Sequence, residues 1–336
     1  MKLPMAPSAP PSALLELYDV AALQAEVRDL ARERDAVILA HNYQLPEIQE
    51  VADYVGDSLG LSQQAARAQA STIAFCGVHF MAETASVLCP EKTVLIADLD
   101  AGCSLADAIT PDQLRAWQAE HPAAVTVMYV NTTAAVKALT DYCVTSSNAV
   151  SVVEHILREQ GADTEILFGP DMFLGAYVER RIGRSLHIWD GECHVHAGIR
   201  PRDIEQVRAA HPGADFLIHP ECGCSTSVME YAASGDIEGE GVHMLSTGGM
   251  LSYANEAKPG STAIVATEIG MLHPLRAAAP ETEFVAANER AACTYMKMIT
   301  LPKLRDSLRD GVHEVKVPVD VAERARVPIE RMVAIS

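Results

Sequence analysis

The sequence predicts an α/β protein built from parallel sheets that are covered by helices on both faces. Short, almost continuously apolar runs recur along the chain, and helical segments lie between most of them. Runs of this kind are typical of strands buried on both faces of a parallel sheet. Several runs end in polar residues, at the place where α/β folds present their chemistry. We therefore expect three-layer αβα units with functional side chains at the carboxyl ends of the strands.

The elements can be assigned in chain order. Residues 14–33 have helical periodicity and precede an apolar run at 36–40, and Pro46 is expected to open one helix that continues to about residue 68. Further strands are expected at 72–76, 93–97, 124–130, 142–145, 165–168, 185–189, 215–218, 243–246, 262–266, 283–286 and 313–317.

Length and composition restrict the class of protein. A chain of 336 residues is too long for one ordinary core and implies two or three domains. The net charge of -19 argues against a nucleic-acid partner, because binding phosphates requires clustered Lys and Arg. No apolar run approaches the ~20 residues of a membrane span. Residues 1–12 are expected to form a disordered leader rather than a secretory signal, so the protein is expected in the cytoplasm.

A coarser repeat is visible in the polar strand ends. His41, Tyr129 and His219 begin three such ends at intervals of 88 and 90 residues, and a second polar end follows each of them, at 76–79, 145–148 and 246–249. This layout predicts three copies of one βα unit, although the ordinary rhythm of α/β proteins would produce a similar pattern. The expected domains are 13–112, 113–198 and 199–336, with the C-terminal helix as a candidate addition to the first.

The segment Gly191-Glu192-Cys193-His194-Val195-His196 carries three metal-binding side chains directly after an apolar run. Thiolate and imidazole groups are good ligands for transition metals. The segment is consistent with a self-contained metal site, and equally with a polar turn that holds a spectator thiol.

The eight cysteines are too few for a disulfide framework in a chain of this length, so we expect thiols, metal ligands or catalytic groups. Cys103, Cys193 and Cys293 are spaced by 90 and 100 residues, one for each copy of the repeat. If the copies surround a pseudo-threefold axis, three thiolates meet, which favours an iron-sulfur cluster or a soft metal. Three cysteines in apolar runs are expected to be core residues: Cys76, Cys89 and Cys143.

Several motifs together resemble a known family. They are Ile38 to Glu47 (ILAHNYQLPE), Gly56 to Ser58, Phe80 to Ala85, Tyr129 to Asn131, Val144 to Ala149, Phe168 to Asp171, His219 to Cys222, Ser246 to Met250 and Met296 to Leu301. In this order, and over nearly everything after residue 35, the chain resembles the quinolinate synthases, the quinolinate synthetase A family.

The resemblance implies a function in de novo NAD biosynthesis. The enzyme would condense iminoaspartate with dihydroxyacetone phosphate to quinolinate, releasing phosphate and water. A partner, L-aspartate oxidase or aspartate dehydrogenase, would supply the iminoaspartate. The resemblance also implies three αβα domains around a central cavity and a [4Fe-4S] cluster whose open iron acts as a Lewis acid. One cysteine from each domain would hold the cluster: Cys103, Cys193 and Cys293.

The same resemblance implies the remaining site residues. The substrate-binding set would be His41, Ser58, Tyr129, Asn131, Ser146, His219, Glu221, Ser246 and Thr247. The proton relays would be Tyr43, Tyr129, His196, His219 and Glu221, with Glu221 as general acid and base. His194 is expected to touch neither cluster nor substrate, and Asp57 is expected to be a structural hydrogen-bonding residue.

Some alternatives stay open from the sequence. Cys222 and Cys224 follow Glu221 directly, and Cys222 could compete as a cluster ligand. A zinc hydrolase that uses Cys193, His194 and His196 would fit the same segment, and so would a non-catalytic iron-sulfur sensor. Four further histidines are expected to be surface or structural residues without partners: His79, His121, His211 and His243.

Overall fold

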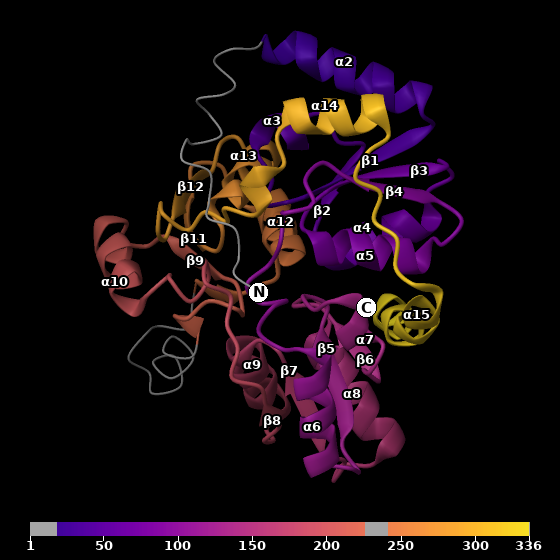
Figure 1. Ribbon diagram of the computed structural model, residues 1–336. Helices are drawn as coiled ribbons and strands as arrows, with labels where there is room; N and C mark the ends of the chain where they lie inside the picture. Colours follow the sequence, from indigo (N-terminus) through magenta and orange to yellow (C-terminus); the bar gives the residue numbers. More distant parts are fainter. Residues whose placement is uncertain (1–18, 226–240, 336) are drawn as a thin grey trace. The chain divides into compact units, whose positions relative to one another are not determined.

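The computed structural model describes residues 19–225 and 241–335 and contains three four-stranded parallel sheets (Figure 1). The expected leader at 1–12 lies outside the described residues. Each sheet has the same strand order, with the first strand second from one edge: β2-β1-β3-β4, β6-β5-β7-β8 and β10-β9-β11-β12. The expected fold class, repeated αβα layers with parallel sheets, is therefore confirmed, whereas the central cavity stays a prediction.

The first sheet belongs to a compact unit made of the chain up to Cys103 and from Cys293 to Ala322. Its strands are β1 (Ala36–His41), β2 (Tyr54–Gly56), β3 (Thr72–Cys76) and β4 (Thr93–Ile96). Helices α2 (Val20–Glu33) and α14 (Leu301–Asp310) cover one face, and α4 (Ser58–Arg67) and α5 (His79–Leu88) cover the other. Two short helices also belong to this unit, α3 (Pro46–Gln49) and η2 (Met296–Met298).

The prediction of one helix from Pro46 to about residue 68 is wrong, because β2 interrupts it. The Asp53 carboxylate accepts a hydrogen bond from Ile38 N at 2.7 Å, which fixes the chain alongside β1 just before β2 begins. Asp57 then caps the second helix by accepting from Gly60 N at 2.8 Å, as expected for a structural residue. A strand predicted at 313–317 is also wrong: only an isolated bridge joins Glu314 to Leu95.

The second compact unit comprises Ser104 to Ala292 and the chain from Glu323 onward, and it holds the other two sheets. The strands of the second sheet are β5 (Val125–Tyr129), β6 (Tyr142–Val144), β7 (Ile166–Gly169) and β8 (His187–Ile188). Its helices are α6 (Pro111–Glu120), α7 (Ala134–Lys137), α8 (Ala149–Gln160) and α9 (Met172–Ile182). The last helix, α15 (Val319–Ala334), is anchored near its end, where Asn148 Nδ2 donates to the Met332 carbonyl at 2.9 Å.

The third sheet repeats this arrangement. Its strands are β9 (Asp215–Ile218), β10 (Val242–Met244), β11 (Thr262–Ala266) and β12 (Glu283–Ala286). The accompanying helices are α10 (Pro201–Ala210), α12 (Thr247–Glu256), η1 (Ile269–Met271) and α13 (Leu272–Ala278). None of the helices described here is long and apolar enough to cross a membrane. The domain boundaries expected after residues 112 and 198 stay predictions.

The common strand order explains the repeat of polar strand ends. His41 and Tyr129 end β1 and β5, and His219 directly follows β9, so all three occupy the same position in their sheets. In the first copy, the prediction of the second polar strand end is wrong, because residues 76–79 follow a different strand from the one expected by analogy with the other copies. Residues 76–79 leave β3, whereas 145–148 and 246–249 follow β6 and β10, whose counterpart is β2. Ser58, just after β2, is therefore the true counterpart of the Ser146 and Thr247 regions.

Candidate active site

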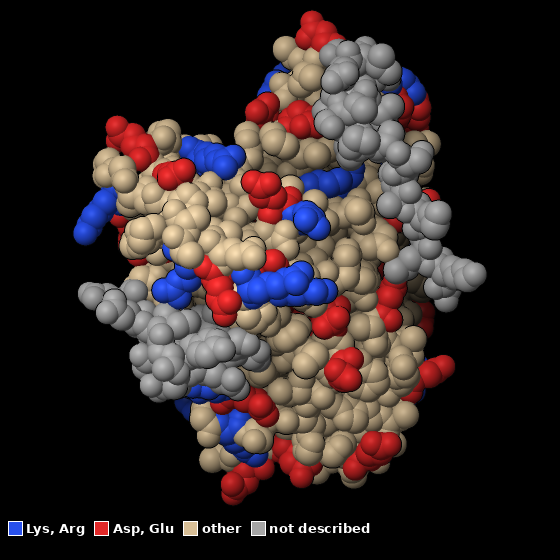
Figure 2. Space-filling model, turned by 90° about the vertical axis from the view of Figure 1, so that its left-hand side faces the viewer, with Lys and Arg blue, Asp and Glu red and all other residues tan. Residues whose placement is uncertain are grey.

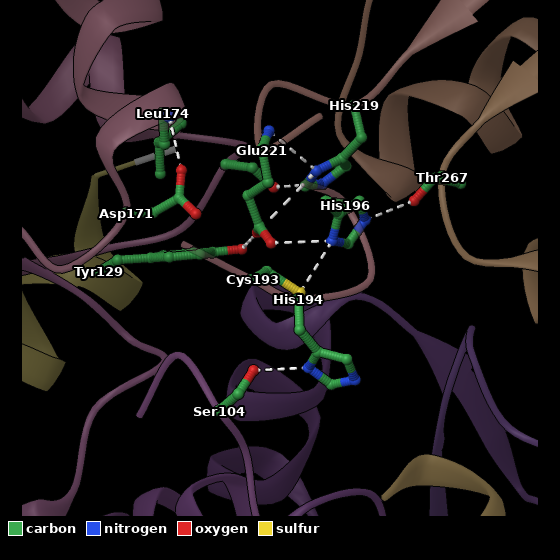
Figure 3. Close-up of polar contacts among 11 residues, drawn as sticks. Ser104, Tyr129, Asp171, Leu174, Cys193, His194, His196, His219, Glu221 and Thr267 are labelled. Carbon is green, nitrogen blue, oxygen red and sulfur yellow. Dashed lines mark hydrogen bonds and ion pairs between the residues drawn. The ribbon is translucent and has the colours of Figure 1, made fainter. Parts of the chain in front are cut away.

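A buried group of polar side chains lies within the second compact unit, where strands of its two sheets end (Figure 3). Tyr129 ends β5, Glu221 comes shortly after β9, and His196 lies in the loop between β8 and α10. All three residues are less than 5% exposed. Groups of this polarity are buried at a cost unless they pair with one another, so their mutual contacts define the site.

Glu221 is at the centre of the group. One oxygen, Oε1, accepts a hydrogen bond from the Tyr129 hydroxyl, and the other, Oε2, lies 3.2 Å from His196 Nδ1. Burial raises the pKa of Glu221 to about 7, and the Tyr129 hydrogen bond opposes part of that rise. A carboxyl group with a pKa near neutrality can both give and take a proton, which is what a general acid and base requires.

His196 joins Glu221 to two further groups. Its Nε2 lies 2.9 Å from Thr267 Oγ1, and its Nδ1 lies 3.2 Å from Cys193 Sγ. Burial, aided by nearby His194, lowers the pKa of His196 to about 3, so the ring is neutral. The ligand atoms of Cys193, His196 and Glu221 all lie within 4.8 Å of one another, close enough to share a metal ion.

His219 is a further buried member of the group. Its ring stacks on the His196 ring with centroids 5.0 Å apart, and its Nδ1 lies 3.9 Å from Glu221 Oε1. Its Nε2 lies 3.1 Å from Ser146 Oγ, just after β6. Four of the five predicted proton relays, Tyr129, His196, His219 and Glu221, are thus brought together in this unit.

Two residues of the site escaped prediction from the sequence. Thr267, 2% exposed, follows β11 and orients His196 through the contact just described. Asp171 is fully buried and caps α9 by accepting from Leu174 N at 2.7 Å. Burial and the Glu221 carboxylate raise the pKa of Asp171 well above its usual value, and the backbone N–H groups of Leu174 and Cys193 oppose this. Asp171 therefore links the Cys193 loop to Glu221.

The loop that carries Cys193 is held against the second sheet at Gly191. Met172 N donates to the Gly191 carbonyl at 2.8 Å, and Gly191 bridges to Asp171. A Cβ atom at position 191 would lie 2.5 Å from the Pro170 carbonyl oxygen, so only glycine fits this close approach. The glycine of the segment thus serves to place the thiol that follows it.

The structure divides the eight cysteines into three groups. Burial raises the pKa of Cys76 and Cys143 to about 12, and Cys89 is also buried, which confirms these as core thiols. Cys222 and Cys224 form a disulfide, contrary to the expectation that all eight are thiols or ligands. The remaining three are half-buried and lie outside the disulfide: Cys103, Cys193 and Cys293.

Cys103 and Cys293 lie in the first compact unit, at the two points where the chain passes into the second. A Cβ atom at Gly102 would lie 3.9 Å from the Tyr295 ring, so the segments that carry these two thiols are neighbours within that unit. His41 and Tyr43 lie in the same unit, where Tyr43 N donates to His41 Nδ1 at 3.1 Å. The fifth predicted relay, Tyr43, is thus held at the end of β1.

Four other predicted substrate-binding residues lie at helix starts or have a buried polar atom: Ser58, Asn131, Ser246 and Thr247. Ser246 caps α12 by accepting from Gly249 N at 3.2 Å, and Thr247 begins that helix and is buried. Asn131 Oδ1 is buried without a hydrogen-bond partner among the described residues, as expected for an atom that a ligand would satisfy. Ser58 opens α4 in the first unit.

Next to this site, His194 belongs to a different environment. Its Nδ1 lies 2.6 Å from Ser104 Oγ, and it lines a cavity of about 380 Å³ with Arg200, Arg202 and Arg290. Figure 2 shows acidic and basic side chains interspersed on one face of the molecule. In a chain of net charge -19, an anion would meet local positive charge in this cavity.

Comparisons with known proteins identify the family of this chain. Residues 25–334 match the family model described as quinolinate synthetase A protein. The chain is 58% identical over 312 residues to quinolinate synthase of Mycobacterium tuberculosis (strain ATCC 25177 / H37Ra), covering 93% of this chain and 88% of that protein. It is 59% identical over 312 residues to quinolinate synthase of Mycobacterium sp. (strain KMS), covering 93% and 91%. The chain therefore belongs to the quinolinate synthetase A family.

Proposed function

We propose that this chain is a quinolinate synthase, which condenses iminoaspartate with dihydroxyacetone phosphate to quinolinate in NAD biosynthesis, releasing phosphate and water. The observation that carries the proposal is the buried Tyr129–Glu221–His196–His219 group beside Cys193. Closing a pyridine ring from these substrates requires repeated proton transfers and the loss of water. A carboxyl group whose pKa lies near 7, between a phenol and two imidazoles, is suited to that work.

Glu221 acts as general acid and base in the enolisation and dehydration steps. It can take a proton from a substrate carbon as the carboxylate and return it to a leaving hydroxyl as the acid. Tyr129 donates to one oxygen and so holds the carboxyl group in place. His196 and His219 contact the Glu221 carboxyl group and are proposed to assist in passing protons onward. Tyr43, at the end of β1, is proposed to assist in the same steps.

The cysteines fit an iron-sulfur cofactor, which is characteristic of this family. Three half-buried cysteines lie outside both the core and the disulfide, one from each predicted repeat: Cys103, Cys193 and Cys293. We propose that they hold a [4Fe-4S] cluster and leave one iron open. When bound, the cluster supplies a Lewis acid that polarises substrate oxygen.

The substrates are anions, and the chain as a whole is strongly acidic. Neutral donors must therefore bind the carboxylates and the phosphate locally, and we propose His41, Ser58, Tyr129, Asn131, Ser146 and Thr247 for this. The proposed substrate-binding set also includes His219, Glu221 and Ser246. Thr247 and Ser58 begin α12 and α4, where backbone N–H groups and the helix dipole favour anions. L-aspartate oxidase or aspartate dehydrogenase would supply the unstable imine, and we place the enzyme in the cytoplasm with these partners.

The test is purification without oxygen, followed by an assay with iminoaspartate and dihydroxyacetone phosphate. We expect a brown protein with broad absorption near 400 nm, as iron-sulfur proteins have, and quinolinate formation that depends on both substrates. A colourless protein that binds zinc through Cys193 would instead support the zinc hydrolase. A brown protein that forms no quinolinate would contradict the proposal and support a sensor.

A further inference from the structure

Three side chains with metal-binding atoms meet at the end of the second sheet that lies away from the candidate active site. His121 lies between α6 and β5, Glu165 directly precedes β7, and His187 begins β8. From the sequence, His121 is expected to be a surface or structural residue without a partner, and the lack of a partner is wrong. It faces both Glu165 and His187, and its ring centroid lies 4.1 Å from that of His187.

The parallel register of the sheet brings the three together. His187 pairs with Leu167, and Glu165 is two residues before Leu167, so the Glu165 and His187 side chains share one face of the sheet. The Glu165 carbonyl accepts from Val125 N at 2.8 Å, which fixes its backbone beside the start of β5. His121 is held by the hydrogen bond from Ala124 N to its carbonyl, at 3.0 Å. All three positions are thus set by backbone contacts.

The distances fit a shared ion better than direct hydrogen bonds. Glu165 Oε2 lies 3.7 Å from His121 Nδ1 and 3.9 Å from His187 Nε2, and the three ligand atoms lie within 4.8 Å of one another. Both contacts are too long for hydrogen bonds. In a tetrahedral zinc site, ligand atoms lie about 3.3 Å apart, because each is about 2.0–2.1 Å from the metal. Small side-chain rotations would therefore suffice to close the site.

We propose that His121, Glu165 and His187 form a binding site for a divalent transition-metal ion, with zinc as the ion that fits best. Two imidazole nitrogens and one carboxylate oxygen are ligands that zinc accepts, whereas calcium and magnesium prefer all-oxygen sites. The side chains are 26%, 54% and 42% exposed, so an ion can enter from solvent and water can complete its coordination. The net charge of -19 favours a cation further.

The ion would stabilise β8, the short strand at one edge of the second sheet. Strand β8 consists of His187 and Ile188 and, among the described strands, pairs only with β7. A metal at His187 would tie this strand to β7 and to the segment before β5. The chain leaving β8 reaches Cys193 through Gly191, so the ion would stabilise the base of the loop that carries this thiol. The role is structural and independent of the proposed reaction.

The chain provides a matched control in the third sheet. His243 Nε2 lies 3.8 Å from Asp215 Oδ2, with side chains 38% and 40% exposed, so this pair resembles Glu165 and His187 in distance and exposure. It has no second imidazole beside it among the described residues; its ring neighbour is Tyr253. Replacing His243 therefore removes an equivalent histidine without removing a ligand of the proposed site.

The experiment titrates zinc into the cluster-loaded protein under anaerobic conditions, by calorimetry, and records its X-ray absorption at the zinc edge. Wild type is expected to bind one equivalent of zinc with nitrogen and oxygen neighbours and no sulfur. His187→Ala and Glu165→Gln are each expected to weaken binding by about thirty-fold or more. His243→Ala is expected to bind as wild type does. Zinc should raise the Tm of wild type by about 2 °C and leave that of His187→Ala unchanged.

The proposal is overturned if wild type binds no zinc, or if His187→Ala and His243→Ala bind it equally well. Sulfur in the absorption spectrum would place the ion at the cysteines instead and would also overturn it. The Tm of each variant without zinc shows that it is folded. Because zinc binding is measured directly, these outcomes do not depend on whether the protein makes quinolinate.

Discussion

The two ends of the second sheet carry the same kinds of side chain in opposite surroundings. At the carboxyl ends of its strands, Tyr129 and Asp171 join His196 and Glu221 in a group that is almost completely buried. At the amino ends, the side chains of His121, Glu165 and His187 are 26%, 54% and 42% exposed. Both groups combine histidines with a carboxylate, so composition alone does not distinguish them.

Burial makes the difference between the two ends. It moves the pKa of Glu221 up to about 7 and that of His196 down to about 3, because a charged form loses hydration inside the protein. The rise brings the Glu221 pKa close to neutral pH, as proton transfer requires, and the fall keeps the His196 ring uncharged; a metal ligand at the surface needs neither shift. The buried end is therefore suited to acid-base chemistry, and the exposed end to holding an ion.

The largest effect is expected from replacing Cys193, whose thiol lies beside His196 in the buried group. Cys193→Ser is expected to abolish both the bound iron and quinolinate formation, because Cys193 is one of the three proposed ligands. Cys143→Ser is the control, since Cys143 is a fully buried core thiol in the same sheet. Iron and sulfide content, measured after anaerobic purification, checks both variants.

Cys222→Ser adds a sharper comparison. Cys222 is bonded to Cys224, so its replacement is expected to leave the iron content unchanged. The ligand assignment fails if Cys222→Ser loses iron while Cys193→Ser retains it.

The next effect separates acid-base function from ligation. Glu221→Gln is expected to lower kcat by about 10²–10⁴-fold, the usual contribution of a general acid or base. Iron content should not change. Since burial raises the pKa of Glu221, keeping this group ionised at neutral pH costs folding stability, and the neutral amide should therefore raise the Tm.

Glu283→Gln is the matched control for that variant, because Glu283 is an exposed residue at the start of β12. It should leave both kcat and Tm as in wild type. Turnover of Glu221→Gln within a few-fold of wild type would show that another group transfers the proton.

Much of the buried end could be predicted from the sequence, and the exposed end could not. Tyr129 and His219 stand out because each follows an apolar run of strand length, so a polar strand end is visible locally. His121, Glu165 and His187 are separated by 44 and 22 residues and meet only through strand register. Long-range register leaves no local pattern to read.

Other failures have local causes. Asp171 and Thr267 resemble ordinary residues at strand ends, and Asp171 also caps a helix, so their contacts with the site are hidden behind a common structural role. Strand β2 has only three residues within a stretch of helical periodicity, so the sequence favours one continuous helix there. Because the sequence does not predict β2, the second polar strand end of the first repeat is expected after β3 instead of after β2.

A smaller effect is expected at Asp171, which acts on the site through the Cys193 loop and Glu221. Asp171→Asn keeps a good cap for α9 but replaces the carboxyl group near Glu221 by a neutral amide, so we expect unchanged or higher stability and a kcat reduced by about tenfold. Asp171→Ala should also lose about 1 kcal/mol of unfolding free energy, because the cap is gone. Urea denaturation and steady-state kinetics distinguish the two variants; equal stability would show that capping is unimportant here.

The smallest effect tests how closely the buried end depends on each hydrogen bond. Thr267→Val keeps the shape of the side chain but removes the hydroxyl at 2.9 Å from His196 Nε2. The ring then loses one of its orienting contacts, which is worth about 1 kcal/mol, and kcat should fall by about five-fold. Thr267→Ser retains the hydroxyl and should restore most of the rate. If both variants equal wild type, His219 stacking and the Glu221 contact suffice to orient His196.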